Sequence, residues 1–246
     1  MNLVLLEPTD RVGDDNDVYV LSGVRAAHVR EVLRAAPGKQ IRVGLLEGPH
    51  GAGEVLEVSE QRVCLRCVFE PDTPQRPPFD LILAVPRPKS LRKLLPEVTA
   101  FGVDRIVLLR TWRVAKPFLS ATVLHPDEYR PLLHEGMMQG RHTREPEVLF
   151  EPLFKPFVED RLDALFANAA HRLVAHPGVE RSMAQVRIGP QDRVVGVIGP
   201  EGGLLPYEVA ALQQHGFEPV RMGPTPLRVE TACVALMAQV ELLRGM

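Results

Sequence analysis

The stretch "VIGPEGGLLPYEVAAL", residues Val197–Leu212, combines the end of an apolar strand, a glycine-rich turn and the start of a helix. Glycine allows positive φ and close approach of another molecule to the backbone, whereas proline fixes φ and removes an amide donor. The pair Gly199-Pro200 therefore indicates a stiff loop with exposed backbone groups. In open α/β sheets, ligands bind outside the carboxyl ends of the strands, where such loops lie. The stretch predicts a ligand-binding loop.

Two more strands end in similar loops, "LVAHPG" at residues 173–178 and "RMGPTPLRVETA" at residues 221–232. We expect the three loops to form one pocket, although each alone is also typical of a tight strand-to-helix turn without a ligand. A dinucleotide fingerprint would open a helix after the first strand, with the spacing G-x-G-x-x-G, and a phosphate loop would end in Gly-Lys-Ser/Thr. The sequence has neither pattern at these positions.

From residue 79 onward, apolar strands alternate with amphipathic helices. This pattern predicts an α/β fold with a mostly parallel sheet covered on both faces. The helix at 90–102 is expected to be interrupted or to begin late because of Pro96. The predicted strands span residues 79–85, 104–111, 171–178, 192–203 and 217–224, and the predicted helices span 90–102, 125–140, 156–169, 206–216 and 229–245.

The first 70 residues predict a small antiparallel barrel or sheet with one inserted helix. Short strand-like runs are separated by turn signals, including a turn at 49–53. The stretch "PDTPQRPP", residues 71–78, favours an extended, rigid connection, and we place a domain boundary there. The predicted strands are 18–22, 39–48, 54–60 and 62–70, and the predicted helix is 26–34.

Composition restricts the class of protein. The 246 residues are 45% hydrophobic and 24% charged, with a net charge of -2, which suits a globular chain. No apolar run approaches the ~20 residues of a membrane helix, and the start lacks the pattern of a signal peptide, so we expect a cytoplasmic protein without membrane contact. Cys64 and Cys67 lie three apart in a predicted strand and should face opposite sides, which favours a structural role and no metal.

The segments "VIGPEGG", "PYEV" and "MGPTPLRVETACVAL" resemble the C-terminal signature of the SPOUT methyltransferases, most closely the RsmE family of 16S ribosomal RNA uridine N3-methyltransferases. The runs "AHVREVLR", "PGKQIRVG" and "FGVDRIVLLRT" extend the resemblance over the chain. It implies a PUA-like RNA-binding β-barrel domain at residues 1–72. Residues 79–246 would form a SPOUT-type α/β domain whose C-terminal trefoil knot binds S-adenosyl-L-methionine.

Two segments depart from the family pattern. The family's Gln-Lys-Ala-Thr-Glu-Leu-Gly is replaced by "LPEVTAFG" at 95–102, and the Glu-Gln pair that precedes Gly-Arg is only partly kept in Met138–Arg141. Because both segments are expected near RNA, the substrate is less determined than the cofactor. Two alternatives stay open: a non-catalytic RNA-binding or ribosome-assembly factor, and an enzyme acting on another base or on transfer RNA.

The resemblance also implies the site. N3 of uracil is a poor nucleophile until its proton leaves, and a fixed guanidinium, that of Arg228, would stabilise the charge that develops. Glu230 would act as base, orient Arg228 or simply favour the helix start, and Thr231 is alternatively a helix cap. Glu201 is alternatively a partner of backbone amides in the following turn. The predicted cofactor-binding residues are Gly178, Ile198, Gly199, Pro200, Glu201, Gly202, Gly203, Met222, Gly223, Leu227 and Thr231.

Basic residues are the candidates for RNA contact. From residue 86 to residue 116 the chain carries an excess of Arg and Lys, which suits a phosphate backbone or, alternatively, a solvated helix face. His28 is alternatively a packing residue, and His176 a structural residue or one near the cofactor. The resemblance implies 16S ribosomal RNA within the 30S subunit as partner, and a homodimer. The predicted RNA-binding residues are Arg25, His28, Arg30, Arg34, Arg87, Lys89, Arg141 and Arg144.

Overall fold

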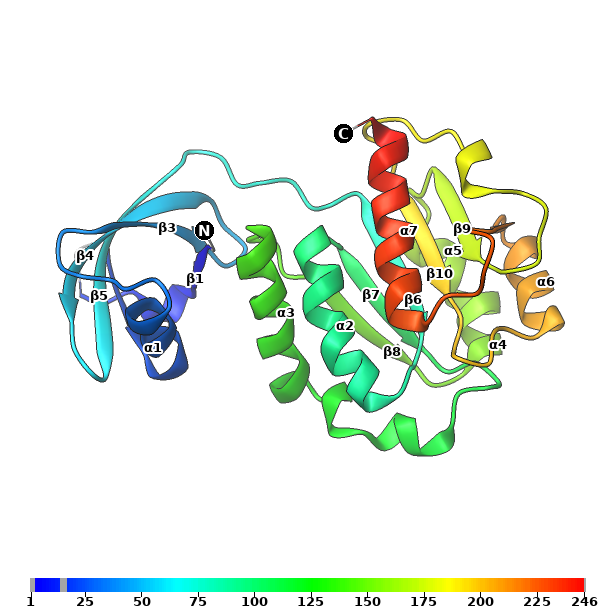
Figure 1. Ribbon diagram of the computed structural model, residues 1–246, viewed down its shortest axis with the longest axis horizontal. Coiled ribbons are helices and arrows are strands. Elements are labelled where there is room, and N and C mark those ends of the chain that lie inside the picture. The colour runs from blue at the N-terminus through cyan, green and yellow to red at the C-terminus, as the bar shows by residue number, and fades with distance from the viewer. Residues whose placement is uncertain (1–2, 14–16, 246) are drawn as a thin grey trace. The chain divides into compact units, whose positions relative to one another are not determined.

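The computed structural model describes residues 3–13 and 17–245 and forms two compact units (Figure 1). The smaller unit is Met1–Arg76 with His134–Glu145, and the larger is Pro77–Leu133 with Pro146–Met246. The domain ranges expected from the sequence include residues 1, 2, 14–16 and 246, which lie outside the described part. Helix α3 (Pro126–Gly140) has its first half in the larger unit and its second half in the smaller.

The smaller unit is built on a five-stranded sheet in the order β1-β3-β4-β5-β2. The prediction of a purely antiparallel sheet is wrong, because β1 pairs with β3 in parallel. This strand of three residues was too short to stand out in the sequence, yet all three side chains are buried. The elements of this unit are β1 (Val4–Leu6), η1 (Pro8–Asp10), β2 (Val18–Ser22), α1 (Gly23–Glu31), β3 (Gln40–Leu45), β4 (His50–Val58) and β5 (Arg62–Phe69).

The turn predicted at 49–53 is also wrong, since β4 begins at His50. The chain reverses earlier, where Glu47 adopts a φ of 59° and the amide of Gly48 donates to the carbonyl of Leu45 at 2.8 Å. Glycine is needed further along for another reason. A Cβ at Gly51 would lie 2.4 Å from the carbonyl oxygen of Val68 on the paired strand, so this glycine serves close strand pairing.

The larger unit contains a six-stranded, fully parallel sheet in the order β11-β9-β10-β6-β7-β8, as the alternating pattern predicted. Strand β8 was missed, because it is a half-exposed edge strand with Glu at both ends. The elements are β6 (Phe79–Ala84), α2 (Pro88–Phe101), β7 (Arg105–Leu109), η2 (Lys116–Ser120), η3 (Thr122–Leu124), β8 (Glu147–Glu151), α4 (Phe154–Pro156), the π-helical η4 (Phe157–Arg161), α5 (Leu162–Leu165), β9 (His171–Ala175), η5 (Met183–Gln185), β10 (Val194–Ile198), α6 (Pro206–Gln214), β11 (Glu218–Val220) and α7 (Val229–Arg244).

Helices cover both faces of this sheet (Figure 1). Helices α2 and α7 pack together on one face, and α4, α5 and α6 contribute to the core on the other. The interruption predicted at Pro96 is wrong, because α2 continues through it. Burial of Leu91, Leu94, Leu95 and Val98 along one face of α2 offsets the backbone hydrogen bond that proline removes. No described helix has the length and apolarity to span a membrane.

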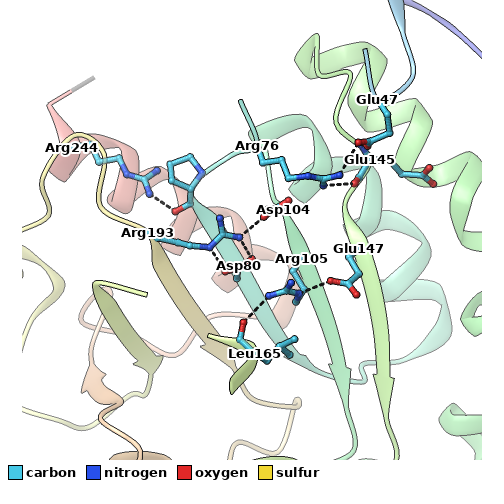
Figure 2. Close-up of polar contacts among 11 residues, drawn as sticks. Glu47, Arg76, Asp80, Asp104, Arg105, Glu145, Glu147, Leu165, Arg193 and Arg244 are labelled. Carbon is cyan, nitrogen blue, oxygen red and sulfur yellow. Dashed lines mark hydrogen bonds and ion pairs between the residues drawn. The ribbon is translucent and has the colours of Figure 1, made fainter. Parts of the chain in front are cut away.

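A buried ionic network fixes the amino ends of the central strands (Figure 2). Arg193 donates two hydrogen bonds to Asp80, at 2.7 and 2.8 Å, and a third to Asp104. Nearby, the guanidinium of Arg244 donates to the carbonyl oxygens of Pro78 at 2.7 Å and Asp192 at 2.9 Å. Strands β6, β7 and β10 are therefore tied together at the edge opposite their loop-bearing carboxyl ends.

Candidate functional site

A cavity of about 690 Å³ lies at the carboxyl edge of four neighbouring strands, β11, β9, β10 and β6. Its size is within the range of small-molecule sites. The three predicted loops all contribute to its walls, and the loop after β6 forms a fourth. Its lining residues are Arg87, Ser90, Ala175, His176, Pro177, Ile198, Gly199, Pro200, Glu201, Gly202, Gly203, Leu204, Arg221, Met222, Gly223, Thr225, Pro226, Leu227, Arg228, Val229, Glu230 and Ala232.

Most of the predicted cofactor-binding residues line this cavity, but Gly178 and Thr231 do not. Gly178 adopts a φ of 84° in the turn that follows β9. Thr231 lies in the first turn of α7, whose N-cap position is Arg228. The interpretation of Thr231 as the helix cap is therefore wrong, because the helix begins three residues earlier than that role requires.

The loop after β10 is held from outside by Arg113. The guanidinium of Arg113 donates to the carbonyl oxygen of Gly202, and a Cβ on Gly202 would lie 3.1 Å from Cδ of Arg113. Within the loop, Gly203 adopts a φ of 74° and its amide donates to the carbonyl of Pro200 at 2.7 Å. This contact could not be predicted from local sequence, because it joins residues 89 positions apart.

Glu201 does not pair with the following turn as the alternative interpretation expected. Its carboxylate accepts a hydrogen bond from the backbone amide of Arg87 at 3.2 Å, which joins the loops after β10 and β6. The turn before α6 is served by Glu208, which accepts from the amide of Leu205 at 2.7 Å. The other oxygen of Glu208 accepts from the amide of Trp112 at 2.8 Å. Glu208 is fully buried and fixes both segments.

Arg228 and Glu230 lie at the start of α7 and line the same cavity. Arg228 is exposed and occupies the N-cap position of α7. A hydrogen bond from the hydroxyl of Ser90 lowers the pKa of Glu230, and the charges of Arg228 and Lys93 act in the same direction. Glu230 is therefore an ionised carboxylate at neutral pH. Ser90 was not predicted as a site residue; the only signal in the sequence was its position at the start of the helix that follows β6.

The basic residues predicted to contact RNA have different surroundings. Arg25 donates to both carboxylate oxygens of Asp10 at 2.6 Å, and Arg30 donates to the carbonyl of Glu60 at 2.5 Å. Arg144 lies 3.4 Å from Glu47, which also pairs with Arg76 (Figure 2). In the remaining set, His28 is half-buried in α1, Arg34 and Arg141 are exposed with φ of 49° and 59°, Lys89 is exposed in α2, and Arg87 lines the cavity.

Within residues 3–13 and 17–245, no cluster of three or more His, Cys, Asp or Glu side chains could hold a metal ion. Cys67 is buried while Cys64 is half-buried, in agreement with their expected opposite orientation. Burial raises the pKa of the Cys67 thiol to about 12. Cys67 is therefore a neutral packing residue at physiological pH.

Comparison with known sequences places this site in a family. A profile described as the RNA methyltransferase domain matches residues 73–241, which include every residue that lines the cavity. The chain belongs to the RNA methyltransferase domain family. This confirms the resemblance that the glycine-rich loops suggested.

Relatives in this family match over nearly the whole chain. Ribosomal RNA small subunit methyltransferase E of Mycobacterium tuberculosis is 26% identical over 98% of this chain and 92% of its own length. The protein with that name from Treponema pallidum is 27% identical over 98% of this chain and 90% of its own. Both units of the structure are thus present in these relatives.

Solved structures show the same fold. The Neisseria gonorrhoeae Ribosomal RNA small subunit methyltransferase E bound to S-adenosyl methionine superposes with a TM-score of 0.78, at 19% identity over 99% of this chain and 98% of that one. A methyltransferase from Legionella pneumophila in complex with the cofactor SAM gives a TM-score of 0.75, at 21% identity over 98% of each chain. The α/β methyltransferase fold expected from the sequence is confirmed by these likenesses.

Proposed function

We propose that this protein transfers a methyl group from S-adenosyl-L-methionine to N3 of a uridine in 16S ribosomal RNA. The observation that carries the proposal is the position of Arg228 on the wall of a cavity that the glycine-rich loops also line. The full-length similarity to small subunit methyltransferases supports the substrate class.

The cavity fits the methyl donor. Backbone of the loop after β10 and the apolar side chains of Ile198, Met222 and Leu227 would hold its adenosine and methionine portions. Gly223 has no atom within 4 Å of the position of a Cβ, so a ligand can approach its backbone closely. When bound, the donor supplies an electrophilic methyl carbon on a sulfonium. We infer that the loops forming these walls belong to a trefoil knot, as in the SPOUT fold.

Arg228 has the chemistry that the acceptor requires. Loss of the N3 proton spreads negative charge over the two flanking carbonyl oxygens of uracil, and a fixed guanidinium beside them stabilises that charge. The N-cap position at α7 also places partial positive charge of the helix end nearby. Arg228 therefore acts as the electrostatic catalyst in this proposal.

Glu230 is assigned the orientation of Arg228 rather than proton removal. A carboxylate whose pKa lies below its usual range is a weak base, because it releases a proton readily. The hydrogen bond from Ser90 fixes the carboxylate, and its charge favours a defined position of the Arg228 guanidinium. The proton is then accepted by solvent or by a group of the RNA substrate.

The RNA is proposed to contact both units. Residues 1–72 form the PUA-like RNA-binding domain in this proposal, with exposed Arg34 as a phosphate contact. Residues 79–246 form the methyltransferase domain in this proposal. Exposed Arg87 lines the cavity, and exposed Lys89 follows it by two residues; both are proposed phosphate contacts. Arg25 and Arg30 are engaged with Asp10 and with backbone carbonyls, so we assign them a positioning rather than a direct role.

We further propose a homodimer formed through α7. Thr231, Ala235, Ala238 and Leu242 follow the spacing of one helix face, and Leu242 is 73% exposed. Such a stripe of small and apolar side chains is suited to packing against its own copy. Light scattering of the protein and of the Leu242→Glu variant tests this: a dimer that the variant converts to monomer is expected, and a wild-type monomer would contradict it.

The function is tested by incubating purified protein and labelled donor with 30S subunits that lack the modification. We expect one methyl group per subunit and N3-methyluridine among the nucleosides identified by mass spectrometry. Methylation of another base would indicate an enzyme of the same family with a different substrate. Binding to subunits without methyl incorporation would contradict the proposal and favour a non-catalytic assembly factor.

A further inference from the structure

The single tryptophan of the chain is strongly exposed next to the cavity loop. Trp112 exposes 75% of its surface, and it directly precedes Arg113, whose guanidinium holds the cavity-lining Gly202. A side chain of this size normally gains stability from burial. A large apolar side chain that stays exposed near a ligand site therefore indicates a surface that binds a partner.

The backbone that carries Trp112 is firmly held. Its amide donates to buried Glu208 at 2.8 Å, and the preceding Arg110 amide donates to the carbonyl of Glu151 at 2.9 Å. Thr111 between them is buried, and its carbonyl accepts from the amide of Val114 at 3.2 Å. An indole presented on a rigid backbone loses little conformational entropy when a flat partner stacks on it.

The segment that carries Trp112 is cationic. The sequence from Arg105 to Ser120 contains no acidic residue, and Arg110, Arg113 and Lys116 lie within four positions of the tryptophan. On the neighbouring α6, Tyr207 exposes 52% of its surface, immediately before Glu208. An exposed aromatic side chain flanked by cations in the sequence is the pattern by which proteins hold single-stranded nucleic acid without reading its sequence.

Resting on the proposed function, we propose that Trp112 stacks on a base of single-stranded RNA beside the one that enters the cavity. The indole face provides a sequence-tolerant stacking surface, and the flanking cations attract the phosphates. This contact would hold the strand while the target uridine reaches Arg228. Association of two copies through Trp112 is disfavoured, since it would bring the cations of both segments together.

The experiment uses the native fluorescence of the sole tryptophan. Titration of the full-length protein with single-stranded oligouridylate should quench the Trp112 emission, whereas the methyl donor alone should leave it nearly unchanged. Absence of quenching by oligouridylate would overturn the proposal. A change in emission that follows protein concentration without RNA would also overturn it, because it would place Trp112 in a contact between copies.

Kinetics provide the second measurement. Trp112→Ala should raise the KM for 30S subunits roughly tenfold, the effect of losing one stacked base, with unchanged affinity for the methyl donor. Trp112→Phe should retain most of the wild-type KM. Phe101→Ala removes an aromatic residue with 42% exposure at the opposite edge of the sheet and should have no effect. An unchanged KM in Trp112→Ala would overturn the stacking role alone, whereas a wild-type protein without methyl transfer would overturn the proposed function.

Discussion

The guanidinium of Arg113 donates a hydrogen bond to the carbonyl oxygen of Gly202, so a side chain that follows β7 holds the glycine-rich loop that follows β10. These strands are not neighbours, since β6 lies between them. The loop lines the cavity, so the shape of the cavity depends on a segment that is distant in sequence. Residue 202 is glycine for a reason other than close approach of a ligand. The Arg113 side chain fills the space that a Cβ on Gly202 would occupy.

Gly202→Val and Arg113→Ala should each weaken binding of S-adenosyl-L-methionine about tenfold, because both lose the charge-assisted hydrogen bond that shapes the loop. Arg113→Ala removes the donor, whereas Gly202→Val keeps the carbonyl acceptor but displaces the Arg113 side chain, whose Cδ lies 3.1 Å from the position of a Cβ on Gly202. The double variant should bind only slightly more weakly than either single variant, since both act through one contact. Calorimetry on the three variants measures this. Lys116→Ala is the matched control. Fully additive losses would show that Gly202 and Arg113 act independently.

Arg228→Ala should lower kcat roughly 100- to 1,000-fold while the affinity for the methyl donor stays nearly unchanged, because its charge acts mainly in the transition state. Single-turnover methylation of 30S subunits and donor calorimetry separate the two effects. Arg187→Ala, which removes an exposed arginine outside the cavity lining, is the control. An equal loss of turnover and donor affinity would assign Arg228 to cofactor binding instead.

Ser90→Ala should raise the pKa of Glu230 toward its ordinary value of 4.5, because the hydroxyl is the largest cause of its lowered pKa. The sign follows from the charged form: a hydrogen bond to the carboxylate stabilises it, so its contribution is present above the ordinary pKa and is lost as pH falls through the lowered one. Carbon NMR titration of Glu230 checks this. Ser120→Ala is the control, and an unchanged titration in Ser90→Ala would contradict the contact.

The sequence predicted the larger sheet well because most of its strands contain an apolar run, and a glycine or proline follows β6, β9, β10 and β11 within three residues. It predicted the convergence of three loops because parallel strands present their carboxyl ends at one edge. It missed β8, whose edge position leaves a mixed pattern, and β1, which has three residues. The predicted interruption at Pro96 was wrong because packing of α2 against the sheet outweighs the local helix-breaking preference of proline.

The contacts that shape the site could not be predicted in the same way. Ser90, Arg113 and Glu208 act on residues between 89 and 140 positions away, and nothing in their local sequence marks those partners. Glu201 shows the converse, since its local position suggested a turn partner while the fold supplies the amide of Arg87. The local sequence pattern thus predicted where the loops lie, whereas long-range tertiary contacts determine which side chains hold them.

The buried network at the amino edge gives a prediction about stability. Asp80 has no exposed surface, and burial raises its pKa although Arg193 opposes that shift. Arg193→Met leaves this carboxylate without its main partner, so the free energy of unfolding at pH 7 should fall by about 3–5 kcal/mol. A buried acid with a raised pKa favours folding below its ordinary pKa, and that contribution is lost as pH rises.

The loss in Arg193→Met should therefore shrink as pH falls and Asp80 takes up a proton. Urea unfolding at pH 7 and at mildly acidic pH measures both effects. Arg181→Met is the matched control, since Arg181 pairs at 2.5 Å with Glu218, both side chains are about half exposed, and the expected cost of losing a surface pair is about 0–1 kcal/mol. If Arg193→Met were no more destabilising than Arg181→Met, or if its deficit were the same at both pH values, the network would not depend on an ionised Asp80.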